Sequence, residues 1–295
     1  MMSAFQRLHA RIGELAAAQI FFIGGAMKSG TTWLQLLLDS HPNVACKGEG
    51  HVANHLAPML AQDIDRHNRK IAQKNQDVFN EIEGFPVYAR DDLSYLIGAA
   101  LLLPLAGVDS KLDLRAVGEK TPDNVRHFDL LHAVFPNARF LHVVRDGRDC
   151  AVSAWFHNLR ATPDWMKTTH PSLPAYAAMF AREWATDIAH AESFAAARPG
   201  ACLTVRYEGL LDDTAGVLRQ VLDFLGVPGD AHMVAQCCAA ARFEQLSAGR
   251  ARGDEDRGSF FRNGTSGNWR EHLDASANRA FIEAASPWLE MLGYV

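Results

Sequence analysis

The sequence has no apolar run of the roughly 18 residues that a membrane-spanning helix needs. Its longest apolar stretch, YLIGAALLLPLAGV at 95–108, contains Pro104 and is interpreted as a buried or acceptor-lining helix. Residues 1–30 lack the cationic start, long apolar centre and small-residue cleavage site of a secretory signal. We therefore expect no membrane span and a cytoplasmic location.

Paired cysteines and an excess of basic charge are also missing. The five cysteines show no CxxC spacing, so the sequence predicts neither a disulfide framework nor a zinc site. The net charge of −5 disfavours a protein that coats nucleic acid, because such proteins usually carry a net basic surface. We expect no nucleic-acid partner, while a local basic pocket is compatible with this charge.

The composition and the hydrophobic patterning predict one α/β domain. Hydrophobic residues make up 48% of the 295 residues and charged residues 21%, which is ordinary for a globular protein with a sizeable core. Apolar runs predict strands at 19–25, 44–46, 139–144 and 202–207, and helical spacing predicts helices at 31–40, 149–159 and 213–225. This alternation is typical of a three-layer fold with a mainly parallel central sheet flanked by helices.

Two segments interrupt this alternation within the single domain at 1–295. The stretch from about 51 to 113 has mixed helical patterning and a polar centre, and it is interpreted as a helical insertion. The stretch 247–267 is rich in Gly, Arg, Asp and Ser, a composition typical of a mobile surface loop. Helical patterning resumes at Asn268.

The segment GGAMKSGTTW at 24–33 indicates a phosphate-binding turn. A strand that ends in a short glycine-bearing turn and opens a helix directs backbone N–H groups at one spot, where the helix dipole also favours an anion. Lys28 adds a mobile cation, and Thr31 and Thr32 add hydroxyl donors on the first helical turn.

The order of residues in this turn differs from that of nucleoside triphosphatases. Their loop places Lys directly after the second Gly, whereas here Lys28 precedes Gly30. The order resembles the 5′-phosphosulfate loop, close to PKSGTTW, of sulfotransferases that use 3′-phosphoadenosine 5′-phosphosulfate (PAPS). The chain is identified as a P-loop sulfotransferase of bacterial type. The resemblance implies PAPS as cofactor, adenosine 3′,5′-bisphosphate (PAP) as product, and no metal.

A second segment, FLHVVRDGRDCAVSAWFH at 140–157, resembles the strand and helix that hold the 3′-phosphate in this family. The matching positions are Arg145, at the strand end, and Ser153, in the following helix. A guanidinium fork and a hydroxyl are suited to one phosphate. Alternatively, Arg145, Arg148 and Asp149 form a solvated ion-pair cluster of the kind common on protein surfaces.

A third segment, FRNGTSGNWREHL at 261–273, resembles the family's C-terminal RKGxxGDWK motif. In the family, the Arg and the backbone around the first Gly close over the 3′-phosphate, so Arg262 and Gly264 are the matching positions. Asn263 replaces the usual Lys and Asn268 the usual Asp, which removes one positive charge from the phosphate site. The resemblance therefore implies that residues 247–270 form a cofactor lid.

Aromatic residues complete the implied cofactor site. Trp33 and Phe243 match the two residues that flank adenine, and Tyr207 matches a cofactor-contacting Tyr; all three could equally be core residues. The full implied set for PAPS is Lys28, Ser29, Gly30, Thr31, Thr32, Trp33, Arg145, Ser153, Tyr207, Phe243, Arg262, Asn263 and Gly264.

The resemblance also implies catalytic roles. Lys28 would donate to the leaving phosphate oxygen, and Lys120 resembles a second Lys that faces the sulfuryl oxygens. In the steroid and phenol enzymes the base is a His in a KTH segment, but here Pro122 stands in its place. The segment KGEGHV resembles the tyrosylprotein and heparan-type enzymes instead, which implies Glu49 as base with His51 as the alternative. A structural ion pair of Glu49 with Lys28 or Lys47 is the competing interpretation.

The predicted reaction is transfer of a sulfuryl group from PAPS to a hydroxyl or amine of a small-molecule or glycan acceptor. A P-loop kinase that uses ATP and a catalytically silent nucleotide-binding module are the alternatives. The sequence does not identify the acceptor, the choice of O- or N-sulfation, or the oligomeric state. Apolar residues that could line an acceptor pocket, or else a helical core, are Phe85, Tyr88, Leu93, Tyr95 and Leu96.

Overall fold

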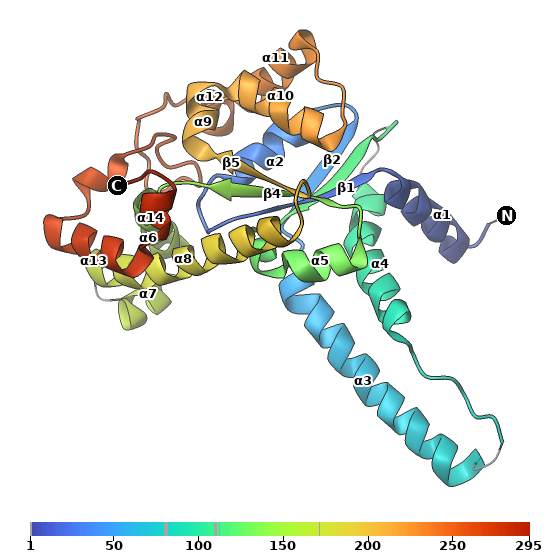
Figure 1. Ribbon diagram of the computed structural model, residues 1–295. Helices are drawn as coiled ribbons and strands as arrows, with labels where there is room; N and C mark the ends of the chain where they lie inside the picture. The colour runs from blue at the N-terminus through green and yellow to red at the C-terminus, as the bar shows by residue number, and fades with distance from the viewer. Residues whose placement is uncertain (1, 80–81, 109–110, 112, 171) are drawn as a thin grey trace.

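A parallel β-sheet forms the centre of the protein (Figure 1). The computed structural model describes residues 2–79, 82–108, 111, 113–170 and 172–295. Within them the strand order is β2-β3-β1-β4-β5, and every neighbouring pair is parallel. The strands are β1 (Gln19–Gly24), β2 (Val44–Gly48), β3 (Ala116–Lys120), β4 (Arg139–Val144) and β5 (Cys202–Arg206). The predicted α/β class with a parallel central sheet is confirmed.

Helices cover both faces of the sheet, as Figure 1 shows. One face packs against α2 (Thr31–Asp39), α9 (Tyr207–Asp212), α10 (Thr214–Leu225), α11 (Ala231–Ala240) and α12 (Phe243–Leu246). The other packs against α1 (Ala4–Ala17), α4 (Arg90–Val108), α5 (Phe128–Val134) and part of α8 (Leu173–Ala197). A third apolar cluster joins α8 to α6 (Gly147–Ala161), α7 (Pro163–Thr169), α13 (Ala275–Ala285) and α14 (Trp288–Met291). Burial of the apolar strand residues between these helices holds the layers together.

The strand register brings several chain segments to one edge of the sheet. Gly24 of β1 lies opposite His142 of β4, and Ile23 lies opposite Lys120 of β3. Because all strands run in the same direction, the segments that follow β1, β2, β3 and β4 leave the sheet at the same edge. Loops at the carboxyl ends of parallel strands are where α/β folds bind their ligands.

The predicted strands agree with the structure, and the strand that was not predicted is short and partly polar. Each of the four predicted strands lies within one or two residues of an observed strand, and Asp213 caps α10 by accepting a hydrogen bond from Gly216 N at 2.8 Å. Strand β3 was not predicted because its five residues, AVGEK, include a glycine and two charges. It is nevertheless buried throughout, because it lies between β1 and β2.

The segment 51–113 contains the π-helical turn η1 (Val52–Leu56), α3 (Ala57–Lys74), a second such turn η2 (Asn75–Phe79) and α4. In Figure 1, α3 projects away from the sheet and the chain returns to α4. Pro104 lies inside α4 without ending it. No helix among the described residues is long and apolar enough to cross a membrane.

The set of apolar residues predicted to line an acceptor pocket, or else a helical core, is not found around the large cavity described below. None of its five members borders that cavity, and Phe85, Tyr88 and Tyr95 are exposed on the projecting segment and on α4. Their helical spacing could not distinguish a lining surface from an exposed one, because spacing alone does not say what covers a helix face.

His142 of β4 generates a prediction about acid stability. The ring is fully buried, neither ring nitrogen has a partner, and burial lowers the pKa of His142 from 6.5 to about 4. As the pH falls from 6.5 toward 4, His142 becomes protonated in the unfolded chain but stays neutral in the folded protein. Folding therefore loses stability across this window, by about 3 kcal/mol from this residue alone.

We expect His142→Leu to remove that part of the acid loss and to leave stability at pH 7 equal or higher, because two unpaired buried nitrogens disappear. Urea unfolding at pH 7, 5.5 and 4.5 measures both effects. The matched control is His232→Leu, since His232 is exposed on α11. An equal acid loss in the wild type and His142→Leu would contradict the prediction.

Candidate functional site

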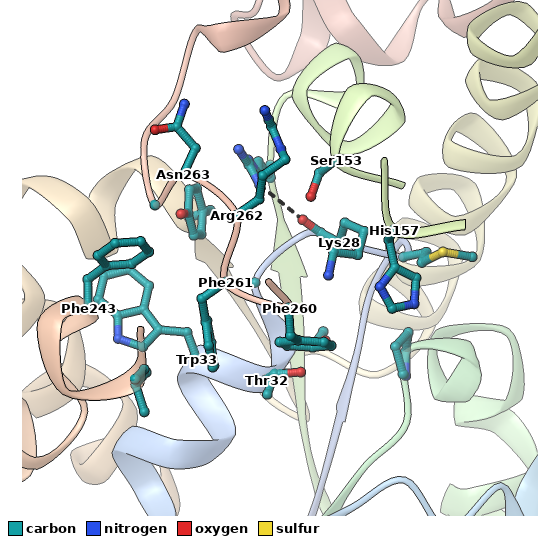
Figure 2. Close-up of a pocket in the computed structure, with 18 of the residues that line it drawn as sticks. Lys28, Thr32, Trp33, Ser153, His157, Phe243, Phe260, Phe261, Arg262 and Asn263 are labelled. Carbon is teal, nitrogen blue, oxygen red and sulfur yellow. Dashed lines mark hydrogen bonds between the residues drawn. The ribbon is translucent and has the colours of Figure 1, made fainter. Parts of the chain in front are cut away.

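A cavity of about 420 Å³ lies at the carboxyl edge of the sheet. Figure 2 shows side chains from the loop after β1, from α6 and from the lid segment, residues 247–270, converging on it. Its walls include most of the predicted site residues: Lys28, Gly30, Thr31, Thr32, Trp33, Glu49, His51, Arg145, Ser153, Tyr207, Phe243, Arg262, Asn263 and Gly264. Ser29 and Lys120 are the predicted residues that do not line it.

The loop after β1 presents backbone donors to the cavity. Gly30 precedes α2 with a left-handed φ of 104°, and no side chain caps the N–H groups of the helix start. A Cβ at Gly30 would lie 2.5 Å from the Tyr207 ring, so only glycine fits there. Lys28 also has a positive φ, 67°, which is a strained conformation for a residue with a side chain. The uncapped helix start is suited to an anion.

Arg145 lies immediately after β4 and next to this loop. Its Nη1 donates to the Lys28 carbonyl at 3.2 Å, the bond dashed in Figure 2, and its Nη2 donates to the Thr265 carbonyl at 2.9 Å. The guanidinium also stacks 4.3 Å from the centre of the Tyr207 ring. The segments at 28 and 145, which the sequence predicted to bind two ends of one ligand, are therefore neighbours.

The alternative of a solvated ion-pair cluster is wrong. Arg145, Arg148 and Asp149 are 7%, 3% and 1% exposed. The Asp149 carboxylate accepts hydrogen bonds from Gly267 N at 2.6 Å and from Trp269 N at 2.9 Å. Asp149 thus fastens the end of the lid segment to the start of α6.

The lid segment places the third predicted motif over the cavity. Arg262 is buried, pairs with Glu255 and donates from Nη2 to Asn268 Oδ1 at 2.7 Å. Asn268, which stands at the position of the family's usual Asp, therefore holds the arginine. Gly264 has a φ of 71°, and a Cβ there would lie 2.5 Å from the Phe243 ring.

Aromatic side chains form the end of the cavity farthest from Lys28 in Figure 2, where Trp33 and Phe243 lie together. Trp33 donates from Nε1 to the Ala241 carbonyl at 2.9 Å and meets the Tyr207 ring edge-on, with centroids 5.8 Å apart. Arg252, which the sequence analysis missed, lies 4.8 Å over the Trp33 ring. These aromatics are both core residues and cavity walls, so the two interpretations do not exclude each other.

Lys28 points into the opposite end of the cavity. Its Nζ lies 4.0 Å from the centre of the Phe260 ring. Burial, with repulsion from Arg145 and Arg160, lowers the pKa of Lys28 to about 8, although Glu49 opposes the shift. A nearby anion would replace the lost solvation of this ammonium, so the site favours anionic ligands.

Glu49 forms an ion pair with Lys120. The sequence suggested Lys28 or Lys47 as the partner of Glu49, and neither forms this ion pair. Lys47 binds Asp39 at 2.7 Å instead. Lys120 is buried, and its Nζ also donates to Thr32 Oγ1 at 3.1 Å. Lys120 does not itself line the cavity, and its ammonium joins Glu49 to the loop after β1; that it faces the reacting group stays a prediction.

Residues near Glu49 complete this end of the site. His51 Nε2 lies 3.7 Å from Glu49 Oε2. His157, Phe260 and Asp123 also line the cavity but were not predicted. His157 follows Ser153 by one helical turn, so its position on α6 was available from spacing. The position of Phe260 depends on the path of the lid segment, so no pattern in the sequence predicts it.

Unpaired buried atoms indicate what the cavity binds. Among the described residues, nine buried side-chain nitrogen and oxygen atoms have no hydrogen-bond partner, and four of them belong to Ser29, Arg145, Arg262 and Asn263. Three of these groups are donors, which leaves capacity for phosphate oxygens. A ligand with two separate anionic groups and an aromatic base fits these walls. The described residues contain no cluster of three or more His, Cys, Asp or Glu side chains suited to a metal.

Comparison with known proteins gives one family. The family model described as the sulfotransferase family matches residues 20–231. A protein-tyrosine sulfotransferase of Drosophila melanogaster is 25% identical over 211 residues, which are 71% of this chain and 38% of that protein. Protein-tyrosine sulfotransferase A of Caenorhabditis elegans is 24% identical over 218 residues, 74% of this chain and 52% of that protein. The chain spans about half or less of the length of these relatives.

Solved structures share the fold. A mouse sulfotransferase complexed with PAP superimposes with a TM-score of 0.56 at 17% identity, covering 97% of this chain and 94% of that chain. A sulfotransferase from Mycobacterium avium superimposes with a TM-score of 0.54 at 13% identity, covering 98% of this chain and 80% of that chain. At these identities the likeness establishes the common architecture.

The Asp149 anchor generates a prediction. We expect Asp149→Ala to lower the free energy of unfolding by about 3 kcal/mol, because a buried and a partly buried N–H group lose a charged acceptor. Hydrogen exchange at Gly267 and Trp269 should accelerate more than exchange in the sheet. Asp164→Ala is the matched control, since the Asp164 side chain is 98% exposed. Unchanged exchange at 267 and 269 would contradict the anchoring role.

Proposed function

We propose that this chain, which belongs to the sulfotransferase family, transfers a sulfuryl group from PAPS to a hydroxyl or amine of an acceptor. The observation that carries the proposal is the shared cavity of the loop at 28–32 and Arg145. A nucleotide with phosphates at both the 5′ and 3′ positions needs two such anion sites side by side. ATP has no 3′-phosphate and would leave the second site empty.

The proposed donor site uses the predicted residues in three groups. The backbone N–H groups before α2, with Thr31 and Thr32, hold the 5′-phosphate. Arg145, Ser153 and Arg262 hold the 3′-phosphate. Trp33 and Phe243 flank the adenine at the aromatic end of the cavity. This assignment is supported by the donors left unpaired at Arg145 and Arg262, which both line the cavity.

Lys28 is proposed to stabilise the charge that develops on the leaving phosphate oxygen. When bound, PAPS supplies a sulfuryl group attached to a phosphate that leaves readily. The Lys28 ammonium points into the cavity and is partly desolvated, so its charge acts in a medium where water screens it poorly. Phe260 covers this ammonium from the lid segment and limits the access of water.

Glu49 is proposed as the base that takes the proton of the acceptor hydroxyl or amine. Its carboxylate lines the cavity near Lys28, and Lys120 holds one oxygen in place from below. Lys120 therefore acts as a positioning residue that links Glu49 to Thr32. The acceptor would enter between Glu49, Asp123 and His157.

Two sources suggest the class of acceptor. The sequence predicts a small molecule or glycan, and the names of the relatives add the tyrosine hydroxyl of a protein. The walls beside Glu49 carry carboxylate, imidazole and amide groups, including Asp123, His51 and Asn158, which favours a polar acceptor.

The direct test is transfer of labelled sulfate from PAPS in the presence of EDTA, with tyrosine peptides, amino sugars and phenols as acceptors. We expect turnover with EDTA present, and a loss on the order of a hundredfold or more in Lys28→Met, because charge stabilisation at the leaving group is removed. Lys167→Met is the matched control, since the Lys167 side chain is 74% exposed on α7.

Each other outcome separates the alternatives. Transfer from ATP that requires Mg²⁺ would favour the kinase. Binding of PAP without any turnover would favour a silent binding module. Full activity in Lys28→Met would contradict the proposed role of Lys28.

A second prediction follows from the pKa of Lys28. Below pH 8 the ammonium is present and attracts the 5′-phosphate; above pH 8 the free protein loses this charge, because its pKa is about 8. We therefore expect the affinity for PAP, measured by calorimetry, to fall as the pH rises from 8 to 9.5, by up to tenfold per pH unit. In Lys28→Arg, whose guanidinium does not titrate in this range, the affinity should stay flat. A flat profile in the wild type would contradict the prediction.

A further inference from the structure

A hydrogen-bonded chain of side chains lies beside Glu49 at the acceptor end of the cavity. It runs from Asp123, in the 3₁₀ helix η3 (Pro122–His127), through Asn54 of η1 to His51. Asn54 Nδ2 lies 2.8 Å from Asp123 Oδ2 and 3.2 Å from His51 Nδ1. The far nitrogen of the same ring, Nε2, lies 3.7 Å from Glu49 Oε2.

The chemistry of these groups determines where the imidazole proton lies. An ionised carboxylate only accepts hydrogen bonds, so the atom of Asn54 that faces Asp123 must be the amide nitrogen. The reversed amide would set an oxygen against the carboxylate. The second N–H of that nitrogen faces His51 Nδ1, which must then accept. A neutral imidazole that accepts at Nδ1 carries its proton on Nε2, the nitrogen directed at Glu49.

The surrounding contacts hold the ring in this orientation. The His51 ring stacks on His55, with centroids 5.1 Å apart and planes 17° from parallel. The His51 backbone N–H donates to Thr121 Oγ1 at 3.3 Å, and its φ of 49° is the left-handed conformation. The stack holds the plane of the ring, and the Asn54 contact decides which nitrogen faces Glu49, because a 180° flip of the ring would keep the stack but lose that contact.

We propose that Asn54, held by Asp123, is a positioning residue that fixes the His51 tautomer with its proton on Nε2, toward Glu49. The inference rests on the proposed function and refines its base. His51 is then unable to accept the acceptor's proton, because Nε2 already carries one and the Nδ1 lone pair is taken by Asn54. His51 instead directs its Nε2 proton toward the second oxygen of Glu49, 3.7 Å away, while Lys120 holds the first oxygen. Glu49 is left as the base.

Nitrogen NMR of histidine rings tests the tautomer without any substrate. The signals of His51 are assigned by their loss in His51→Gln. In the wild type we expect a protonated Nε2 and an unprotonated Nδ1 at a pH where the ring is neutral. In Asp123→Asn the amide of Asn54 can reverse, because its partner no longer only accepts, and a population protonated at Nδ1 should appear. A wild-type ring protonated at Nδ1, or an unchanged tautomer in Asp123→Asn, would overturn the proposal.

Kinetics test whether the tautomer matters for transfer. We expect Asn54→Ala to lower kcat about tenfold, the effect of one lost hydrogen bond, with the KM for PAPS unchanged. The matched control is Asn68→Ala, because Asn68 lies on α3 and its amide bonds the backbone of Tyr88. An unchanged kcat in Asn54→Ala, or an equal loss of kcat in Asn68→Ala, would contradict the positioning role.

The two proposals fail in different ways. If the wild type transfers no sulfate from PAPS to any acceptor, the proposed function fails, while NMR still decides the tautomer. If the wild type is active but its His51 ring carries the proton on Nδ1, the function stands and this inference fails. Where Asn54→Ala does not fold, Asp123→Asn carries the test, because it keeps the size of the side chain.

Discussion

The parallel pairing of β1 with β4 is the constraint on which the site depends. Gly24 and His142 lie opposite each other, so the loop that carries Lys28 and the residue after β4, Arg145, leave the sheet side by side. The guanidinium then bonds the Lys28 carbonyl at 3.2 Å across 117 residues of sequence. The neighbouring strands β3 and β2 bring Lys120 and Glu49 to the same edge. One sheet edge thus gathers the cationic and hydroxyl groups of the cavity and the pair of Glu49 with Lys120.

Burial of charge gives this site its order and lowers the pKa of Lys28. Arg145 and Asp149 are almost fully buried, and each is held by backbone groups of the lid segment or of the loop after β1. Two of the donors that stay unpaired, on Arg145 and Arg262, border the cavity, where an anionic ligand would satisfy them. The lowered pKa of Lys28 has the same origin, since its ammonium has lost water without gaining a close anion. Such preorganisation removes part of the cost of arranging the site when the ligand arrives.

The lid segment combines a fixed end with an exposed middle. Gly267 and Trp269 are fastened to Asp149, and Thr265 accepts a bond from Arg145. Residues 251–258 are exposed, whereas residues 262 and 263 are buried over the cavity. Segments with few buried contacts open most readily, which suits a wall that must admit and release a nucleotide. A glycine-rich, mobile segment and a position over the site are therefore compatible with each other.

The sequence by itself determined the local features: the apolar strands, the turn at 24–30, Arg145 at a strand end and the motif around Arg262. Each is encoded within about ten neighbouring residues, where spacing and residue type suffice. Only the tertiary structure decided the partners. Strand β3, the pairing of Lys120 with Glu49, the anchor at Asp149 and the cover of Phe260 on Lys28 all join residues far apart in the chain. Such contacts depend on strand order and packing, which no local pattern encodes.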